Sequence, residues 1–243
     1  MIALPVRQAA SSCRVGANNL EEAIALASFA DRTVNHPRRA SLGRLACGCV
    51  SGLLLCAELA YGGGFDHRVE YDNSGIWKRS NQQVLQYGLI GGEIAGALWL
   101  GGEDRLGKTF WQAIDASAVG GVTSEAMKRI FTRSRPTQSP NPDLWFQGRG
   151  HYSFPSGEVT TVTAIVTPFV LEYGRDYPAV YALELLPAYD AIARVKARAH
   201  WQTDVLASFA LGTAAGYLAH ERESPVILGV LPHGFMVGLR KQF

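Results

Sequence analysis

The sequence predicts an all-α protein, a bundle of five or six helices with a polar site at one end. Three observations support this fold class. Long stretches with the composition of buried helices alternate with loops rich in glycine, proline and asparagine, and helix start or stop signals flank several of these stretches. At 243 residues, 47% of them hydrophobic, the chain is also long enough for one large domain with a full core.

Residues 1–64 are predicted to form an N-terminal extension. A helix through about residue 33 can be capped by Asn18 or Asn19. The apolar run 45–61 follows a flank with three arginines and resembles an export signal or a membrane anchor. This run is shorter than the ~20 residues that cross a bilayer, so an ordinary buried helix remains the alternative. All four cysteines lie in the first quarter of the chain, which does not indicate a disulfide framework.

The main domain is predicted to span residues 65–223 and to begin with a polar loop at 65–78. Its first helix, 82–100, contains glycines suited to close packing and ends at a Gly-Gly pair. A longer helix, 106–131, follows. The segment 137–149 is rich in proline, asparagine and glycine, so it is predicted to be an irregular loop.

Three more helices are predicted at 158–173, 179–195 and 201–220. The last two are separated by a turn at 194–200. The tail, residues 224–243, differs in pattern, because two short apolar stretches flank a turn-like Leu-Pro-His-Gly segment. This pattern predicts a short β-hairpin at the C-terminus.

Charge gives little information about partners. The net charge is +2 and the lysines and arginines are dispersed, so no nucleic-acid partner is predicted. Charged residues make up 18% of the chain, below the ~25% of ordinary soluble domains. Association with a membrane therefore stays open on composition alone.

Two polar clusters supply cations and a helix N-terminus. Lys128 and Arg135 lie seven residues apart and straddle a predicted helix end. Ser156 is placed to cap the next apolar helix, and the backbone N–H groups from Gly157 onward can bind an anion there. Each cluster alone also has a structural explanation, a solvated basic face for the first and a simple helix cap for the second.

A third cluster contains a His/Asp pair. His200 and Asp204 lie four residues apart at the start of the last predicted helix, so the carboxylate can approach the ring and leave the other ring nitrogen as a nucleophile or base. Arg194 precedes His200 by six residues. A surface ion pair is the structural alternative. Because the three cations can together offset the charge of about −1.5 to −2 on a phosphate group, the combination predicts a phosphate site.

These motifs, K-x6-R-P, P-S-G and R-x5-H-x3-D, resemble the three-part signature of the type 2 phosphatidic-acid phosphatase and vanadium haloperoxidase superfamily. The resemblance covers roughly residues 65–220. It implies that the three cations, Lys128, Arg135 and Arg194, hold the phosphate oxygens, with help from Ser156 and the Gly157 amide. It also implies that His200 is the nucleophile that forms a phosphohistidine and that Asp204 orients it, with no metal and no other cofactor.

Two positions depart from the signature. Glu158 stands where the family has the histidine that protonates the leaving oxygen, and Ala193 stands where the family usually has serine. Glu158 can act as the acid if burial raises its pKa. The neighbouring cations and helix N-terminus favour its ionised form instead, which would repel phosphate. His151, in the same loop as the second motif, is a substitute candidate for the acid.

The resemblance implies a metal-independent phosphatase that hydrolyses a phosphomonoester or a diphosphate, with a lipid phosphate among the candidate substrates. The apolar run 45–61, taken as an anchor or an export signal, predicts a membrane-associated or exported protein, on the periplasmic side if bacterial. Two alternatives remain. One is a catalytically impaired phosphate-binding or membrane scaffold protein, and the other is a haloperoxidase. Vanadate would be a cofactor only under the second alternative.

Overall fold

The computed structural model describes residues 64–222, and this part of the chain contains helices and no strands. Its elements are η1 (Gly75–Trp77), α3 (Arg79–Leu100), α4 (Arg105–Phe131), α5 (Gly157–Tyr173), η2 (Pro178–Glu184), α6 (Leu185–Lys196) and α7 (Gln202–His220). The predicted all-α class is confirmed. The predicted N-terminal helix, the apolar run 45–61 and the C-terminal hairpin lie outside the described residues, and the domain boundaries stay predictions.

The helix ends follow from local chemistry. Helix α3 ends at Gly101, whose φ of 69° is a conformation that glycine adopts at little cost. The Asp104 side chain caps α4 by accepting a hydrogen bond from the Gly107 N–H. Both helices begin slightly earlier than predicted, and for α3 this matters because its first residue, Arg79, belongs to the site described below.

The prediction of a single helix at 179–195 is wrong, because the structure divides this segment into η2 and α6. Pro187 lies in the first turn of α6, where its missing N–H costs nothing. In a continuous α-helix the same proline would remove a hydrogen bond to Leu183 and clash with its carbonyl group. Helix α6 also runs on to Lys196, so Arg194 lies in the helix and not in the predicted turn.

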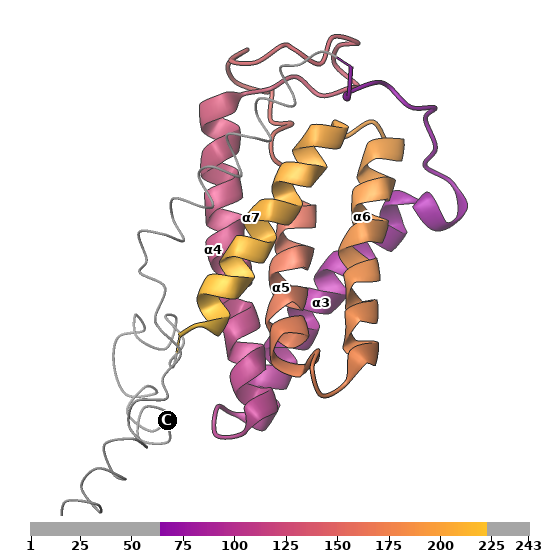
Figure 1. The fold of residues 1–243 in the computed structure, drawn as a ribbon. Helices are drawn as coiled ribbons and strands as arrows, with labels where there is room; N and C mark the ends of the chain where they lie inside the picture. The colour runs from indigo at the N-terminus through magenta and orange to yellow at the C-terminus, as the bar shows by residue number, and fades with distance from the viewer. Residues whose placement is uncertain (1–63, 223–243) are drawn as a thin grey trace, which may run out of the picture. The chain divides into compact units, whose positions relative to one another are not determined.

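Helix α5 lies at the centre of the bundle, packed against α4 and α7 and also in contact with α3 and α6 (Figure 1). Small side chains allow close approach: Ala116, Ala164, Ala215 and Ala219 form one buried cluster. At Gly212 an added Cβ atom would lie 2.6 Å from the carbonyl oxygen of Thr160, so α7 packs backbone to backbone against α5. This packing fixes the first turns of α5 and α7 beside the end of α4.

None of the helices within residues 64–222 combines the length and the apolar character that a membrane crossing requires.

Candidate active site

A cavity of about 370 Å³ lies where α4 and α6 end and α5 begins. The structure brings six of the predicted site residues to its wall: Lys128, Arg135, Gly157, Glu158, Arg194 and His200. They come from three helices and two loops, yet all reach one end of the bundle. The arrangement of the first turn of α5 among cations is that of an anion site.

The cations are held in place by close contacts. Arg135 donates hydrogen bonds to the carbonyl oxygens of Ala199 (3.2 Å) and Tyr152 (3.1 Å), which ties two loops together at the cavity. Lys128 lies directly over the start of α5, because a Cβ atom added at Gly157 would come within 2.8 Å of its Nζ atom. Glycine at this position therefore lets the ammonium group reach the helix N-terminus.

His200 is buried and lies with its Nδ1 atom 2.6 Å from the carbonyl oxygen of Ser153. A carbonyl oxygen can only accept, so Nδ1 carries the proton and Nε2 keeps its lone pair in the neutral ring. Burial, and then the positive charges of Arg194, Arg135 and Lys128, lower the pKa of His200 well below 6.5. The ring is thus neutral at pH 7 and available as a nucleophile.

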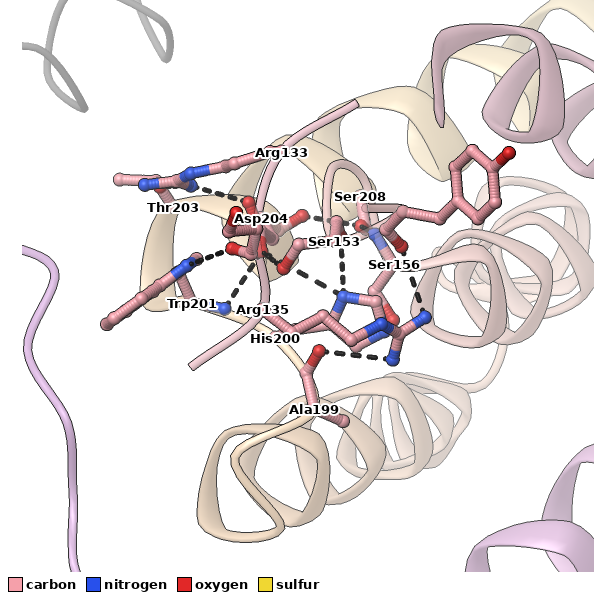
Figure 2. A network of polar contacts seen from close by, with 12 residues as sticks. Arg133, Arg135, Ser153, Ser156, Ala199, His200, Trp201, Thr203, Asp204 and Ser208 are labelled. Carbon is pink, nitrogen blue, oxygen red and sulfur yellow. Dashed lines mark hydrogen bonds and ion pairs between the residues drawn. The ribbon is translucent and has the colours of Figure 1, made fainter. Parts of the chain in front are cut away.

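Asp204 does not contact the imidazole ring in the way the sequence predicted. Its nearest oxygen lies 3.9 Å from Nδ1 of His200 and accepts hydrogen bonds from the Ser153 hydroxyl and the Trp201 N–H (Figure 2). The other oxygen accepts from Arg133 at 2.6 Å. Asp204 therefore fixes the Ser153 segment, and the Ser153 carbonyl group in turn fixes the ring.

Arg133, which the sequence analysis did not single out, is the centre of this buried network. Its side chain is fully buried and pairs with Asp204 and with Asp66, the latter at 2.7 Å. Further hydrogen bonds to Pro142 and Thr203 complete its donors. One guanidinium group thereby joins the start of the described chain, the loop after α4 and the first turn of α7.

Glu158 forms a two-pronged ion pair with Arg79, with nitrogen–oxygen distances of 2.5 and 2.7 Å. Arg194 lies 3.8 Å from the same carboxylate. Burial alone would raise the pKa of Glu158, but Arg79, Arg194 and Lys128 outweigh burial and the pKa is lowered. Of the two outcomes that the sequence left open, the structure favours the ionised carboxylate.

The other predicted residues lie away from the cavity wall. Ser156 occupies the N-cap position of α5, yet its hydroxyl group does not cap the helix and has no hydrogen-bond partner among residues 64–222. Its backbone N–H donates to the Ser208 hydroxyl at 2.7 Å. His151 lies with its Nδ1 atom 2.9 Å from the Ser134 hydroxyl and does not line the cavity. Ala193 is buried in α6.

Sequence reasoning missed most of the wall that α3 and α4 supply: Arg79, Gln86, Tyr87, Ser124 and Glu125. The signal for Glu125 was its place three residues before Lys128, one helical turn away. The α3 residues carried no local signal, because they lie about eighty residues before Glu158. With four cations and two carboxylates in the lining and a neutral His200, the cavity has a formal charge of 4 − 2 = +2.

Comparison with known proteins agrees with the motif analysis. Residues 110–224 match the sequence model of the family described as the PAP2 superfamily, which confirms the resemblance. A lipid A 1-phosphatase from Porphyromonas gingivalis is 32% identical over 109 residues, and this region covers 44% of the present chain and 22% of that protein. The chain therefore spans less than a quarter of the length of this relative.

Two solved structures are similar. The crystal structure of Aquifex aeolicus LpxE shares 21% identity, with 70% of this chain and 86% of that chain covered and a TM-score of 0.42. The crystal structure of the first transmembrane PAP2 type phosphatidylglycerolphosphate phosphatase, from Bacillus subtilis, shares 17% identity, with 70% and 93% covered and a TM-score of 0.43.

Proposed function

We propose that this chain, whose residues 110–224 belong to the PAP2 superfamily, is a lipid phosphatase that acts through a phosphohistidine on His200. One observation carries the proposal: a neutral imidazole, held at Nδ1 by the Ser153 carbonyl group, lines a cavity with three cations predicted to hold phosphate. The relative named as a lipid A 1-phosphatase supports a lipid phosphate as the substrate.

The charge of the cavity suits a phosphate group. The lining carries a formal charge of +2, and a phosphomonoester carries about −1.5 to −2 at pH 7. Arg135 and Arg194 offer planar donors to two oxygens, while Lys128 acts as a point charge beside the N-terminus of α5. We infer that these groups hold the three non-bridging oxygens and stabilise their charge in the transition state.

The reaction then proceeds in two displacements. In the first, the Nε2 lone pair of His200 forms the N–P bond as the P–O bond to the leaving group breaks. The ring becomes a phosphorylated cation, which the Ser153 carbonyl group stabilises through the Nδ1 proton. In the second, water attacks phosphorus, the N–P bond breaks, and free phosphate and neutral His200 are restored.

Protonation of the leaving oxygen is the step that this site supports least. Glu158 is ionised and paired with Arg79, so it has no proton to donate near neutral pH. We infer that the Arg79 guanidinium stabilises the leaving oxygen by charge instead. Loss of a general acid costs ~10²–10⁴-fold for a poor leaving group. Diphosphates, whose leaving group is a stable phosphate anion, are therefore the favoured substrates, while acid roles for Glu158 or His151 stay predictions.

A second candidate function is phosphate binding without turnover. The pairing of Glu158 with Arg79 favours it, because the paired carboxylate is ionised and has no proton to give to a leaving group. In that case the chain would be a phosphate-binding or membrane scaffold protein. In both cases we propose that it is membrane-associated or exported, in line with the lipid substrate named for the relative from Porphyromonas gingivalis.

Trapping the intermediate separates the two functions. Protein mixed with a radiolabelled diphosphate and quenched in alkali should retain acid-labile label, and His200→Gln should retain none. His67→Gln is the matched control, because His67 is exposed and does not line the cavity. Label that survives in His200→Gln would refute the nucleophile, and binding without label in the unaltered protein would favour the scaffold.

A further inference from the structure

A second cavity of about 290 Å³ lies beside the cavity that His200 lines, which is called the catalytic cavity below. Helices α3 and α5 contribute to the walls of both. Helix α3 contributes Gly88, Leu89 and Gly92 to its wall. Helix α5 contributes Ile165, Val166 and Phe169. Apart from Glu93, each lining residue is apolar or glycine, so this cavity has the character of a site for hydrocarbon.

The two cavities follow one another along α3 and α5. On α3, Tyr87 lines the catalytic cavity and the next residue, Gly88, lines the apolar one. On α5, Thr161 lines the catalytic cavity and Ile165, one turn further on, lines the apolar one. One helical turn is about 5.4 Å. The apolar cavity therefore begins within one helical turn of residues that line the cationic cavity.

We propose that the apolar cavity binds the hydrocarbon chain of the substrate, so that the enzyme selects amphiphilic phosphates with a chain attached close to the phosphate. This inference rests on the proposed phosphatase function and adds a chain-binding site to it. The occupant follows from the closeness of the two cavities along α3 and α5 and from the change from polar to apolar lining within one turn of each helix.

Glu93 is the polar exception in this wall. It is buried, and one of its oxygens accepts a hydrogen bond from the Ser117 hydroxyl at 2.9 Å. Its other oxygen has no hydrogen-bond partner among the described residues. Burial raises the pKa of Glu93 to about 7, with Ser117 opposing the shift. In its neutral form the carboxyl group can border a hydrocarbon chain without leaving a buried charge.

Glycines in α3 permit a clean test. A Cβ atom added at Gly88, Gly91 or Gly92 meets nothing within 4 Å. Gly88 and Gly92 line the apolar cavity, whereas Gly91 does not. Gly88→Leu and Gly92→Leu should fill the cavity, and Gly91→Leu is the matched control. All three replace glycine in a helix interior, so helix propensity should not fall.

The measurement is kcat/KM for a series of monoalkyl diphosphates from butyl to dodecyl, each below its aggregation concentration. In the unaltered protein kcat/KM should rise about threefold to fourfold for each buried methylene until the cavity is filled. Gly88→Leu and Gly92→Leu should flatten this rise and leave hydrolysis of p-nitrophenyl phosphate unchanged. Gly91→Leu should keep the full rise.

The outcomes separate this inference from the proposed function. Equal chain-length dependence in Gly92→Leu, Gly88→Leu and the unaltered protein would overturn the chain site while leaving the phosphatase intact. If no phosphate is hydrolysed, the proposed function fails, and calorimetry with dodecyl phosphonate decides the chain site. Binding weakened at least tenfold in either cavity-filling variant but not in Gly91→Leu supports it, and equal binding in all of them overturns it.

Discussion

His200 holds its Nδ1 atom 2.6 Å from the carbonyl oxygen of Ser153. This contact, rather than a direct contact with a carboxylate, fixes the tautomer of the imidazole ring. A backbone carbonyl group adds no formal charge, so burial, and then the cations around the ring, keep the pKa of His200 low. His200, the proposed nucleophile, is consequently neutral without depending on the protonation state of a neighbouring acid.

The first prediction concerns the link from Asp204 through Ser153 to His200. Ser153→Ala removes the hydroxyl group that Asp204 accepts from but keeps the carbonyl group. We expect kcat to fall roughly 10- to 100-fold, by analogy with the loss of a hydrogen-bonded partner that orients a metal-binding histidine, with KM nearly unchanged. Single-turnover phosphorylation of His200 is the measurement. A change in KM alone would show that Ser153 serves substrate binding instead.

The second prediction concerns the buried triad of Arg133 with Asp66 and Asp204. Arg133→Met leaves two buried carboxylates without their cation, which should cost about 3–5 kcal/mol of unfolding free energy. Arg129→Met is the control, because Arg129 forms an exposed pair worth about 1 kcal/mol or less. Urea unfolding of the two variants measures both costs. Equal losses would mean that the triad contributes no more than a surface pair.

The triad also shows why the sequence predicted part of the site and missed the rest. Local chemistry reveals the ends of α3 to α5, because glycine, proline and Asp104 act within a few residues of each helix end. Lys128 and His200 could be recognised because each belongs to a spaced motif. Asp66 could not, since its partner lies 67 residues further along the chain and only tertiary packing joins them.

The same reasoning explains the role of Asp204. A spacing of four residues indicates that two side chains share a helix face, but His200 precedes the first residue of α7 and is not part of that helix. The two side chains therefore do not share a helix face, and the Asp204 carboxylate accepts a hydrogen bond from the Trp201 N–H instead. Arg79 was missed because the sequence gives no sign that the start of α3 reaches α5.

The third prediction concerns Asp190, which is 1% exposed and whose two oxygens lack hydrogen-bond partners among the described residues. Burial, and then the charge of Glu158, raise its pKa to about 7. In the unfolded chain the group ionises near 3.8, so between about pH 4 and 7 the folded state binds more protons than the unfolded state. Stability from this group therefore falls as pH rises through that window.

Asp190→Asn should remove this pH dependence and stabilise the protein at pH 8, by up to about 4 kcal/mol on the order of the pKa shift. Thermal unfolding from pH 4 to 8 is the measurement. Because raised pKa values at other groups contribute to the total slope, the difference between the variant and the unaltered protein is the relevant quantity. A difference that does not grow with pH would contradict the shifted pKa.

The fourth prediction concerns the close approach of Lys128 to Gly157. A methyl group at position 157 would lie 2.8 Å from the Nζ atom, so Gly157→Ala should push the flexible ammonium group away from the start of α5. We expect phosphate binding to weaken roughly tenfold, because one charge-assisted contact is lost. Inhibition by inorganic phosphate measures this, with Gly91→Ala as control. Unchanged inhibition would show that Lys128 does not hold phosphate.

The last prediction concerns the ion pair between Glu158 and Arg79. If the carboxylate only neutralises Arg79, Glu158→Gln raises the formal charge of the cavity from +2 to +3 and frees a guanidinium group. Inhibition by vanadate or phosphate should then tighten roughly tenfold, about 1.4 kcal/mol. Glu125→Gln is the matched comparison, because Glu125 lines the same cavity and its replacement changes the charge equally, but it releases Lys128 (3.9 Å away) and Arg129 and not Arg79.

The pH dependence of turnover separates this role from that of a general acid. The pKa of Glu158 is lowered from 4.5, so an acid role would require activity to fall as pH rises through a value below 4.5. Glu158→Gln would then remove that limb, and it would slow alkyl phosphates while sparing p-nitrophenyl phosphate, whose leaving oxygen scarcely needs a proton. We expect instead that, between pH 5 and 8, the variant hydrolyses alkyl phosphates no more slowly relative to p-nitrophenyl phosphate than the unaltered protein does. Selective loss of alkyl phosphate hydrolysis would show that Glu158 is the acid. Tighter anion binding in Glu158→Gln than in Glu125→Gln would show that Glu158 is the counter-ion of Arg79.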